Sequence, residues 1–387
     1  MILDCCKRPL LSVLRNETVY RAFLTRFGRL MRSLTSSPAI IKRVPAGKKM
    51  TGLGVLFLLV FSAFLAGCTE SQDPLPLKAA FASQPDNALN FIAYEKGYFK
   101  KHGLDIQVDF FPSGKRAIHD GFLKHDYDIA TTAEVPFVFA LDENPDLRIF
   151  ASLYGADNVN RIVTRWGVGF NSIDQIAGKV IGTQKSSAVH YFFHRIYNAF
   201  EIPRSDFTLK FYPAEELPQA LANGEIDAFS MREPYVSQAE ALLDGEVNIF
   251  SMPGIYHQFG VAITREETLQ QKNVQLERYL QALFEARNFA ITNPQESIEI
   301  LAEYLSISIP EARALWRPSN LQLGLHQGLI NTIESEIQWR NFLTDLGLDD
   351  RKVDLEVFDL SDYVHVGVMS KVNPYAVMVV YERQKSE

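Results

Sequence analysis

Short apolar blocks and polar turns alternate along residues 77–265. Where apolar residues are contiguous and bounded by Gly, Pro or polar residues they predict strands, and where they recur at helical spacing they predict helices. The expected strands are 77–82, 106–111, 128–132, 148–154, 160–165, 180–181, 247–250 and 260–264. Helices are expected at 88–100 and 115–124, after 134 and from 188. Alternating elements of this length predict an α/β protein with parallel sheets covered on both faces.

The pattern also repeats once, with an offset near 100 residues. The matched pairs are Ala82-Ser83-Gln84 with Gly182-Thr183-Gln184, Phe110-Phe111-Pro112 with Phe211-Tyr212-Pro213, Asp128-Ile129-Ala130 with Asp227-Ala228-Phe229, and Glu134 with Glu233. The Asp and the Glu are six positions apart in both copies. The repeat predicts two βαβαβ lobes of one design, with a hinge and a cleft between them.

Ligands of open α/β sheets bind beyond the carboxyl ends of the strands. If both lobes turn these ends toward each other, they form a clamp that closes on a ligand and excludes water. The predicted ligand-binding residues are Gln84, Thr132, Glu134, Tyr154, Gln184, Ser186, Ser187, His190 and Glu233.

The same pattern places the domain boundaries. Residues 77–165 are expected to form the first part of lobe 1 and residues 166–258 lobe 2, with a hinge at 166–169. Residues 259–387 would complete lobe 1 and add C-terminal helices that stiffen the hinge.

The segment 178–194 reads as a strand, a turn and a helix entered through Ser186-Ser187. A helix start with free N–H groups and hydroxyls binds anions, but ordinary helix capping uses the same residues. His190 and His194 have the spacing of a zinc pair, although one pair lacks the further ligands that zinc needs. We therefore expect no metal, and His190 would instead edge the ligand pocket.

Glu134 and Glu233 could act as a catalytic acid and base, or they could stabilise helix N-termini. The sequence shows neither a nucleophile elbow nor a phosphate-binding loop. We therefore expect a binding protein without enzymatic activity or a cofactor.

Charge is unevenly distributed over the 387 residues. Residues 1–67 hold 11 Lys and Arg against 2 Asp and Glu, whereas the remainder holds 28 against 44, a formal charge of −16. An acidic body argues against nucleic acid as a partner, because backbone binding requires clustered Lys and Arg.

The basic leader contains an uncharged apolar run at 51–67, directly after Lys48 and Lys49. The run is short for a membrane span and ends in small residues, as a signal peptide does. Leu65-Ala66-Gly67-Cys68 resembles the bacterial lipobox, which implies cleavage before Cys68 and a lipid on its sulfur. A plain signal peptide or an N-terminal anchor helix is the alternative.

We accordingly expect a leader at 1–67 and a lipid-anchored tether at 68–76. Translation could also start at Met31 or Met50. Cys5 and Cys6 fall within the leader, so the body would contain no disulfide and no cysteine nucleophile.

Several motifs are similar to those of solute-binding lipoproteins of nitrate, sulfonate and taurine importers, a superfamily that includes thiamine-precursor binders. They are 93–99 (AYEKGYF) with 103–106 (GLDI), 221–227 (LANGEID), 232–235 (REPY) and the turn and helix start at 185–191. The resemblance implies a type II periplasmic binding protein fold and delivery of a small ligand to an ABC permease with a cytoplasmic ATPase.

The resemblance also implies that Ser186 and Ser187 hold an anionic group, and that Thr132, Glu134 and Glu233 line the walls. Ser186 stands where the sulfonate binders usually have glycine, which disfavours a simple sulfonate or nitrate. Two carboxylates in one cleft favour a ligand that carries an amine. The candidate anion partners are Arg161, Arg165 and Arg232.

We therefore expect a monomeric solute-binding protein of an ABC importer, located at the periplasmic or extracellular face of a bacterial membrane and anchored at Cys68. The alternatives are a thiamine pyrimidine precursor protein, for binding or biosynthesis, and a module that presents its ligand to a receptor kinase.

Overall fold

The computed structural model of the protein describes residues 73–167, 169–350, 353 and 359–380. The chain divides into two units, Met1–Ser71 and Gln72–Glu387, and the fold described below belongs to the second. The predictions for the leader, for Cys68 and for most of the tether lie outside the described residues.

The first lobe is built on a five-stranded sheet in the order β2-β1-β3-β10-β4. Its strands are β1 (Leu75–Ala82), β2 (Leu104–Phe111), β3 (Ile129–Ala133), β4 (Leu147–Ala156) and β10 (Gln258–Arg265). β1 pairs in parallel with β2 and β3, whereas β10 is antiparallel to both β3 and β4.

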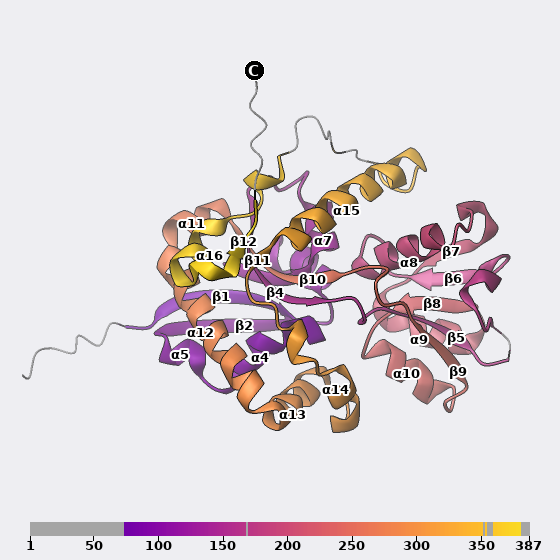
Figure 1. The fold of residues 1–387 in the computed structure, drawn as a ribbon, viewed down its shortest axis with the longest axis horizontal. Helices are drawn as coiled ribbons and strands as arrows, with labels where there is room; N and C mark the ends of the chain where they lie inside the picture. Colours follow the sequence, from indigo (N-terminus) through magenta and orange to yellow (C-terminus); the bar gives the residue numbers. More distant parts are fainter. Residues whose placement is uncertain (1–72, 168, 351–352, 354–358, 381–387) are drawn as a thin grey trace, which may run out of the picture. The chain divides into compact units, whose positions relative to one another are not determined.

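The second lobe repeats this arrangement in the order β7-β6-β8-β5-β9. Its strands are β5 (Arg161–Arg165), β6 (Val180–Thr183), β7 (Thr208–Phe211), β8 (Ala228–Met231) and β9 (Val247–Ser251). β6 is parallel to β7 and β8, and β5 is antiparallel to β8 and β9. The structure confirms the predicted fold class, and Figure 1 shows the two sheets with their connecting chains.

Matching hydrogen bonds explain the repeated aspartates. The Asp128 carboxylate accepts from Lys78 N at 2.8 Å, and the Asp227 carboxylate accepts from Val180 N at 2.7 Å. Each Asp directly precedes a strand, Asp128 before β3 and Asp227 before β8, and binds a backbone N–H of the neighbouring parallel strand, β1 or β6. The repeat in sequence is therefore a repeat of the same strand-end contacts.

The first hinge prediction is wrong. Strand β5 pairs with β8 and β9 and so belongs to the second sheet, which moves the first crossing between sheets from 166–169 to 157–160. The second crossing is at 252–257, between β9 and β10. An apolar run identifies a strand, but it carries no mark of the sheet that the strand joins.

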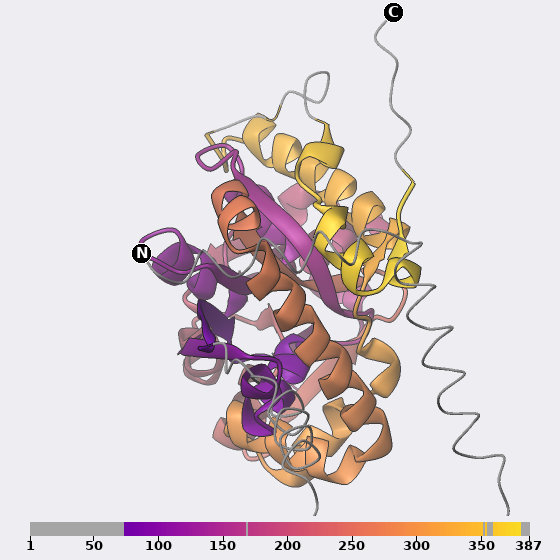
Figure 2. The same cartoon turned by 90° about the vertical axis from the view of Figure 1, so that its left-hand side faces the viewer.

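Helices cover both sheets. In the first lobe they are α4 (Ala88–Glu95), α5 (Tyr98–Lys101), α6 (Gly114–Arg116), α7 (Glu134–Ala140), α11 (Glu266–Gln271), α12 (Asn273–Thr292), α13 (Pro294–Leu305), α14 (Ile309–Leu315) and α16 (Val366–Val372). The second lobe carries α8 (Ala188–Ala199), α9 (Leu217–Asn223) and α10 (Tyr235–Leu242). Figure 2 shows α12, in orange, crossing the first lobe, where it contacts α4 and α16.

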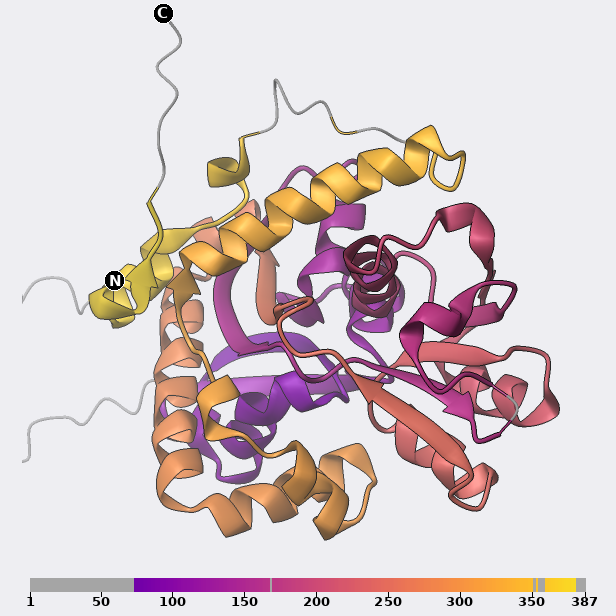
Figure 3. The ribbon, with the colours of Figure 1, turned by 45° about the vertical axis from the view of Figure 1, so that its right-hand side comes forward.

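The long helix α15 (Gln327–Asp345) connects the lobes. Its buried Arg340 binds the first lobe through the Val138 carbonyl at 3.0 Å and the Asp142 carboxylate. The neighbouring Trp339 packs against the rings of His190 and Tyr191 in α8, with ring centroids 4.9 and 5.1 Å apart. In Figure 3, α15 runs from the first lobe toward α8.

Candidate functional site

A small cavity lies between the lobes, where strand ends of the two sheets meet. We call it the interlobe cavity. Its lining residues are Pro85, Asp86, Tyr154, Val159, Arg232, Glu233, Gln258 and Leu315. Pro85 and Asp86 follow the carboxyl end of β1, and Arg232 and Glu233 follow that of β8. Its volume of about 10 Å³ holds roughly one water molecule.

Arg232 bridges the lobes at this cavity. Its Nη2 donates to Gln84 Oε1 of the first lobe at 2.8 Å, and its Nη1 donates to Gln258 Oε1 at 3.2 Å. Gln84 Oε1 also accepts from Gly114 N at 3.1 Å, and Gln258 Oε1 accepts from Asn160 Nδ2 at 3.0 Å. The guanidinium is buried, and these partners are neutral amides, so they leave its positive charge uncompensated.

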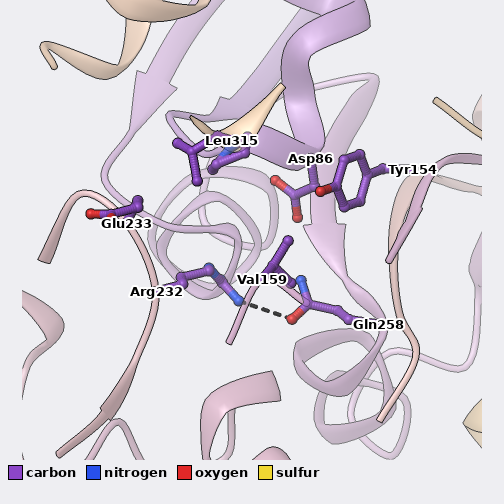
Figure 4. A pocket seen from close by; sticks show the side chains of 8 residues that line it. Asp86, Tyr154, Val159, Arg232, Glu233, Gln258 and Leu315 are labelled. Carbon is purple, nitrogen blue, oxygen red and sulfur yellow. Dashed lines mark hydrogen bonds between the residues drawn. The ribbon is translucent and has the colours of Figure 1, made fainter. Parts of the chain in front are cut away.

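Asp86 supplies the opposite charge. Burial raises the pKa of its carboxyl group, and the charge of Arg232 opposes that rise. Neither Asp86 oxygen has a hydrogen-bond partner among the described residues. Figure 4 shows the Tyr154 hydroxyl directed toward Asp86; this hydroxyl accepts from Asn320 Nδ2 at 2.9 Å.

The structure brings three of the nine predicted residues to the interlobe cavity. Tyr154 and Glu233 line it, and Gln84 adjoins it through Arg232. The Glu233 carboxylate nevertheless points away from Asp86 (Figure 4), because it accepts from Ser237 N at 3.0 Å and Ser237 Oγ at 2.8 Å. That contact fits the capping alternative for Glu233.

Glu134 does not face the cavity. It is fully buried at the start of α7, where its Oε1 accepts from Tyr256 Oη at 2.7 Å and from Phe259 N at 3.0 Å. Tyr256 Oη also lies 3.2 Å from Glu336 Oε1 on α15. A hydroxyl carries one proton, so Tyr256 can donate fully to only one of the two carboxyls, and a proton on the other would let that carboxyl donate to Tyr256 Oη.

The pKa values of this carboxyl pair are displaced accordingly. Burial raises the pKa of Glu134 to about 7, and burial with the charge of Glu134 raises the pKa of Glu336 well above its usual range. Tyr256 lies in the second crossing and Phe259 directly after it, so the pair holds α7, α15 and the hinge together. The prediction that Glu134 lines the cleft wall is therefore wrong, because its carboxyl group is bound to Tyr256 and Phe259 and does not line the interlobe cavity.

Gln184 lies in a second cavity of about 290 Å³, which also contacts both lobes. Its lining residues are Lys115, Arg116, Gln184, Lys185, Phe211, Tyr212, Pro213 and Glu215. Lys115 Nζ of the first lobe donates to the Lys185 carbonyl at 2.5 Å, and Arg116 lies 3.7 Å from Glu215. Burial and the charge of Lys185 lower the pKa of Lys115. The opening is electropositive because three basic residues and one acidic residue line it.

Three of the four remaining predicted residues, Ser186, Ser187 and His190, have structural contacts. Ser187 caps α8: its Oγ donates to the Gln184 carbonyl at 2.5 Å and accepts from His190 N at 3.4 Å. Ser186 N contacts His190 Nδ1 at 3.3 Å, and its φ of 54° is in the left-handed region. The His190 ring is buried between Phe211 and Trp339. Thr132 is buried on β3, and its hydroxyl has no partner among the described residues.

A comparison with models of protein families identifies the family of this chain. Residues 84–297 match the model described as NMT1/THI5 like. The chain belongs to the NMT1/THI5-like family. The match covers more than half of the chain and includes the repeated lobes, which confirms the predicted resemblance.

The chain is also similar to curated sequences and to solved structures. A Bacillus subtilis (strain 168) protein, provisionally named as an aliphatic sulfonates-binding protein, is 26% identical over 194 residues, 48% of this chain and 58% of that protein. The chain therefore spans less than two thirds of this relative's length. The periplasmic aliphatic sulphonate binding protein of Escherichia coli has a TM-score of 0.61 at 17% identity, covering 73% of this chain and 96% of that protein.

Two further solved structures, a binding protein and an enzyme, are also similar to this chain. The alkanesulfonate-binding protein of Xanthomonas axonopodis pv. citri bound to MOPS has a TM-score of 0.64 at 16% identity, covering 76% of this chain and 99% of that protein. The desulfurization enzyme DszB has a TM-score of 0.53 at 14% identity, covering 78% of this chain and 99% of that chain. These matches show the fold, which serves both binding proteins and an enzyme.

The sequence-based interpretation missed Asp86 and gave Arg232 little weight. One signal for Arg232 was available: the repeat aligns it with the apolar Ala133, so a charge appears in only one copy. Asp86 had no such signal, because Asp is common in turns.

Two further findings concern metal ligands and membrane-spanning helices in the described residues of this chain. It contains no group of three or more His, Cys, Asp or Glu arranged to hold a metal ion. Within residues 73–380, apart from the gaps given above, no helix has the length and apolarity to cross a lipid bilayer.

Proposed function

We propose that the protein is the extracytoplasmic solute-binding component of an ABC importer. It captures a small organic ligand between its lobes without making or breaking a bond. The observation that carries the proposal is the interlobe cavity, where buried charges after β1 and β8 meet and Arg232 bonds to Gln84 across the lobes.

Arg232 would bind the acidic group of the ligand. A guanidinium offers planar donors that suit sulfonate and carboxylate oxygens. The Arg232 Nε has no partner among the described residues, so one donor remains for a ligand. The sulfonate-binding names of the relatives support an organic sulfonate or a similar anion.

Ligand entry requires the lobes to separate, because the interlobe cavity holds only about one water molecule. The crossings at 157–160 and 252–257 would serve as hinges. Lys115 and Lys185, at the second cavity, would attract anions to the opening. Gln84 and Tyr154 would contact the bound ligand from the first lobe.

Capture without catalysis fits the chain better than a desulfurase-like reaction. Cysteine occurs only at positions 5, 6 and 68, so the body contains no thiolate nucleophile. The acids with strongly raised pKa values, Glu134 and Glu336, lie at the hinge and away from the interlobe cavity.

The membrane location and the partners complete the proposal. A lipid on Cys68 would anchor the protein outside the cytoplasm, and the monomer would deliver its ligand to a permease and an ATPase. Labelled palmitate should be incorporated into the protein in the producing bacterium, and Cys68→Ala should remove the label. Incorporation that survives Cys68→Ala would contradict the proposed anchor.

Ligand binding can be tested by thermal unfolding with alkanesulfonates, taurine, MOPS, nitrate and aminopyrimidines. A ligand at 100 times its Kd stabilises the folded state by about 2.7 kcal/mol, which raises Tm by several degrees in a domain of this size. Arg232→Gln should abolish the shift, whereas Arg195→Gln, an exposed control on α8, should retain it. A full shift in Arg232→Gln would contradict the proposed site.

A further inference from the structure

Asp86 is a buried carboxyl group that the fold does not use. It lies in the 3-10 turn Pro85–Asn87 directly after β1, and 8% of its surface is exposed. Buried polar groups are almost always hydrogen-bonded, and burying an unpaired charge is costly. Yet both Asp86 oxygens lack a partner among the described residues. A group in this state is expected to be satisfied by something that enters the cavity.

The nearest opposite charge does not satisfy it. Arg232 also lines the interlobe cavity and influences the Asp86 carboxyl electrostatically, but the two side chains form no ion pair in the described structure. The Nη atoms of Arg232 donate to Gln84 and Gln258, and its Nε has no partner in the described part of the chain. A buried cation and a buried anion thus face one cavity with a gap between them.

The free hydrogen-bonding groups around this gap are of two kinds. Among the described residues, Arg232 Nε in the lining and Gln84 Nε2 beside it are donors without partners, and the Asp86 oxygens, toward which the Tyr154 hydroxyl is directed, are acceptors without partners. The remaining lining includes the apolar side chains of Val159 and Leu315. A molecule that fills the gap must therefore present an acceptor to Arg232 and a donor to Asp86.

We propose that Asp86 is a specificity-determining residue that selects zwitterionic solutes, in which an ammonium group lies a few atoms from an acidic group. This inference rests on the proposed function. The ammonium binds the Asp86 carboxylate, and the acidic group binds Arg232. A simple anion would instead bring a like charge beside Asp86 and leave the carboxylate unpaired in the closed site, which disfavours its binding.

The size of the effect follows from the burial. Sites built to hydrogen-bond a substrate group reject the analogue that lacks it far more strongly than apolar pockets reject a missing methylene. We expect the zwitterion to bind at least about 100-fold more tightly than the molecule in which a methyl group replaces the ammonium.

Isothermal titration calorimetry of the purified full-length protein at pH 7 tests this with matched pairs. The pairs are taurine with 1-propanesulfonate, 3-aminopropanesulfonate with 1-butanesulfonate, and 4-aminobutyrate with pentanoate. Asp86→Asn should weaken zwitterion binding at least about 10-fold and leave the partner anion no weaker. Asp105→Asn, an exposed control in the same lobe, should keep the wild-type preference.

Thermal unfolding of the ligand-free variants separates binding from folding. Asp86→Asn keeps the shape of a buried group that has no hydrogen-bond partner among the described residues, so its ligand-free Tm should stay close to that of the wild type. A large drop in Tm would show that Asp86 serves the fold instead, and would overturn the inference. The wild-type preference within each pair needs no variant and tests the proposal independently.

The outcomes distinguish the two proposals. If the wild type binds a simple anion as tightly as its zwitterionic partner, Asp86 does not set specificity, although solute capture stands. Retention of the zwitterion preference in Asp86→Asn would also show that Asp86 does not set specificity. A bound water would then satisfy the Asp86 carboxylate of the wild-type protein. If the wild type binds neither member of any pair and no compound of the thermal panel, both proposals fail.

Discussion

Glu134→Gln is the perturbation whose size the structure defines best. Glu134 is fully buried, and burial raises the pKa of its carboxyl from about 4.5 to about 7. A raised acid pKa means that the folded state binds the proton more tightly than the unfolded state. The associated stability is complete below pH 4.5 and is lost as the pH rises through about 7.

The magnitude follows from the linkage between proton binding and folding. Each pKa unit corresponds to 1.36 kcal/mol, so a shift of about 2.5 units predicts a loss of about 3 kcal/mol between pH 4.5 and pH 7. Glu336 remains in the variant and burial still raises its pKa, so the difference between the two proteins reports the Glu134 carboxyl. Glutamine keeps an acceptor for Tyr256 and Phe259 but carries no titratable proton.

Urea unfolding followed by circular dichroism from pH 4.5 to pH 8 measures the difference. The free energy of unfolding of Glu134→Gln should rise relative to the wild type by about 3 kcal/mol over this interval. The exposed control Glu334→Gln, on α15 beside the pair, should run parallel to the wild type. Parallel curves for Glu134→Gln would show that the buried pair does not hold an extra proton. The variant should also retain ligand binding, because Glu134 lies outside the interlobe cavity.

Three further predictions concern the second lobe. Ser187→Ala removes the cap of α8 and should lower the free energy of unfolding by about 1 kcal/mol in urea titrations without weakening the ligand-dependent Tm shift; loss of that shift alone would restore Ser187 to the binding site. Asp227→Ala leaves the half-buried Val180 N–H without its acceptor and should cost about 1 kcal/mol, whereas an unchanged urea midpoint would contradict the strand-end role. Burial lowers the pKa of His190 to about 3, so its ring should not titrate between pH 5 and pH 8 in NMR spectra, and its contribution to stability should be lost as the pH falls below about 6.5; a ring titration near pH 6.5 would show that it is solvated.

The sequence was sufficient for the architecture because the two lobes obey the same local rules. Strand and helix periodicity located β1, β2 and β3, and the repeated Asp residues marked equivalent strand starts. Periodicity failed at β5, since an apolar strand of the same composition fits either sheet. Pairing in a sheet depends on contacts with residues far away in the sequence, and those contacts leave no local signal.

The site was harder to predict than the fold, for a similar reason. Glu134 and Glu233 occupy equivalent positions after β3 and β8, yet one is bound to Tyr256 at the hinge and the other to Ser237. The direction of a side chain after a strand depends on its tertiary partners, which differ between the lobes. Asp86 became visible as a site residue only when its burial and its missing partners were known.

The most direct test of the central claim is the distance between the lobes in solution. Spin labels at the exposed positions Lys124 and Gln219, one in each lobe, would be attached after Cys5, Cys6 and Cys68 are replaced by Ser. With the tightest-binding zwitterion of the matched pairs, electron-spin distance measurements should give a shorter and narrower distribution than without ligand. Arg232→Gln should keep the broad distribution under the same conditions. An unchanged distribution in a wild-type sample that binds the ligand by calorimetry would contradict capture by lobe closure.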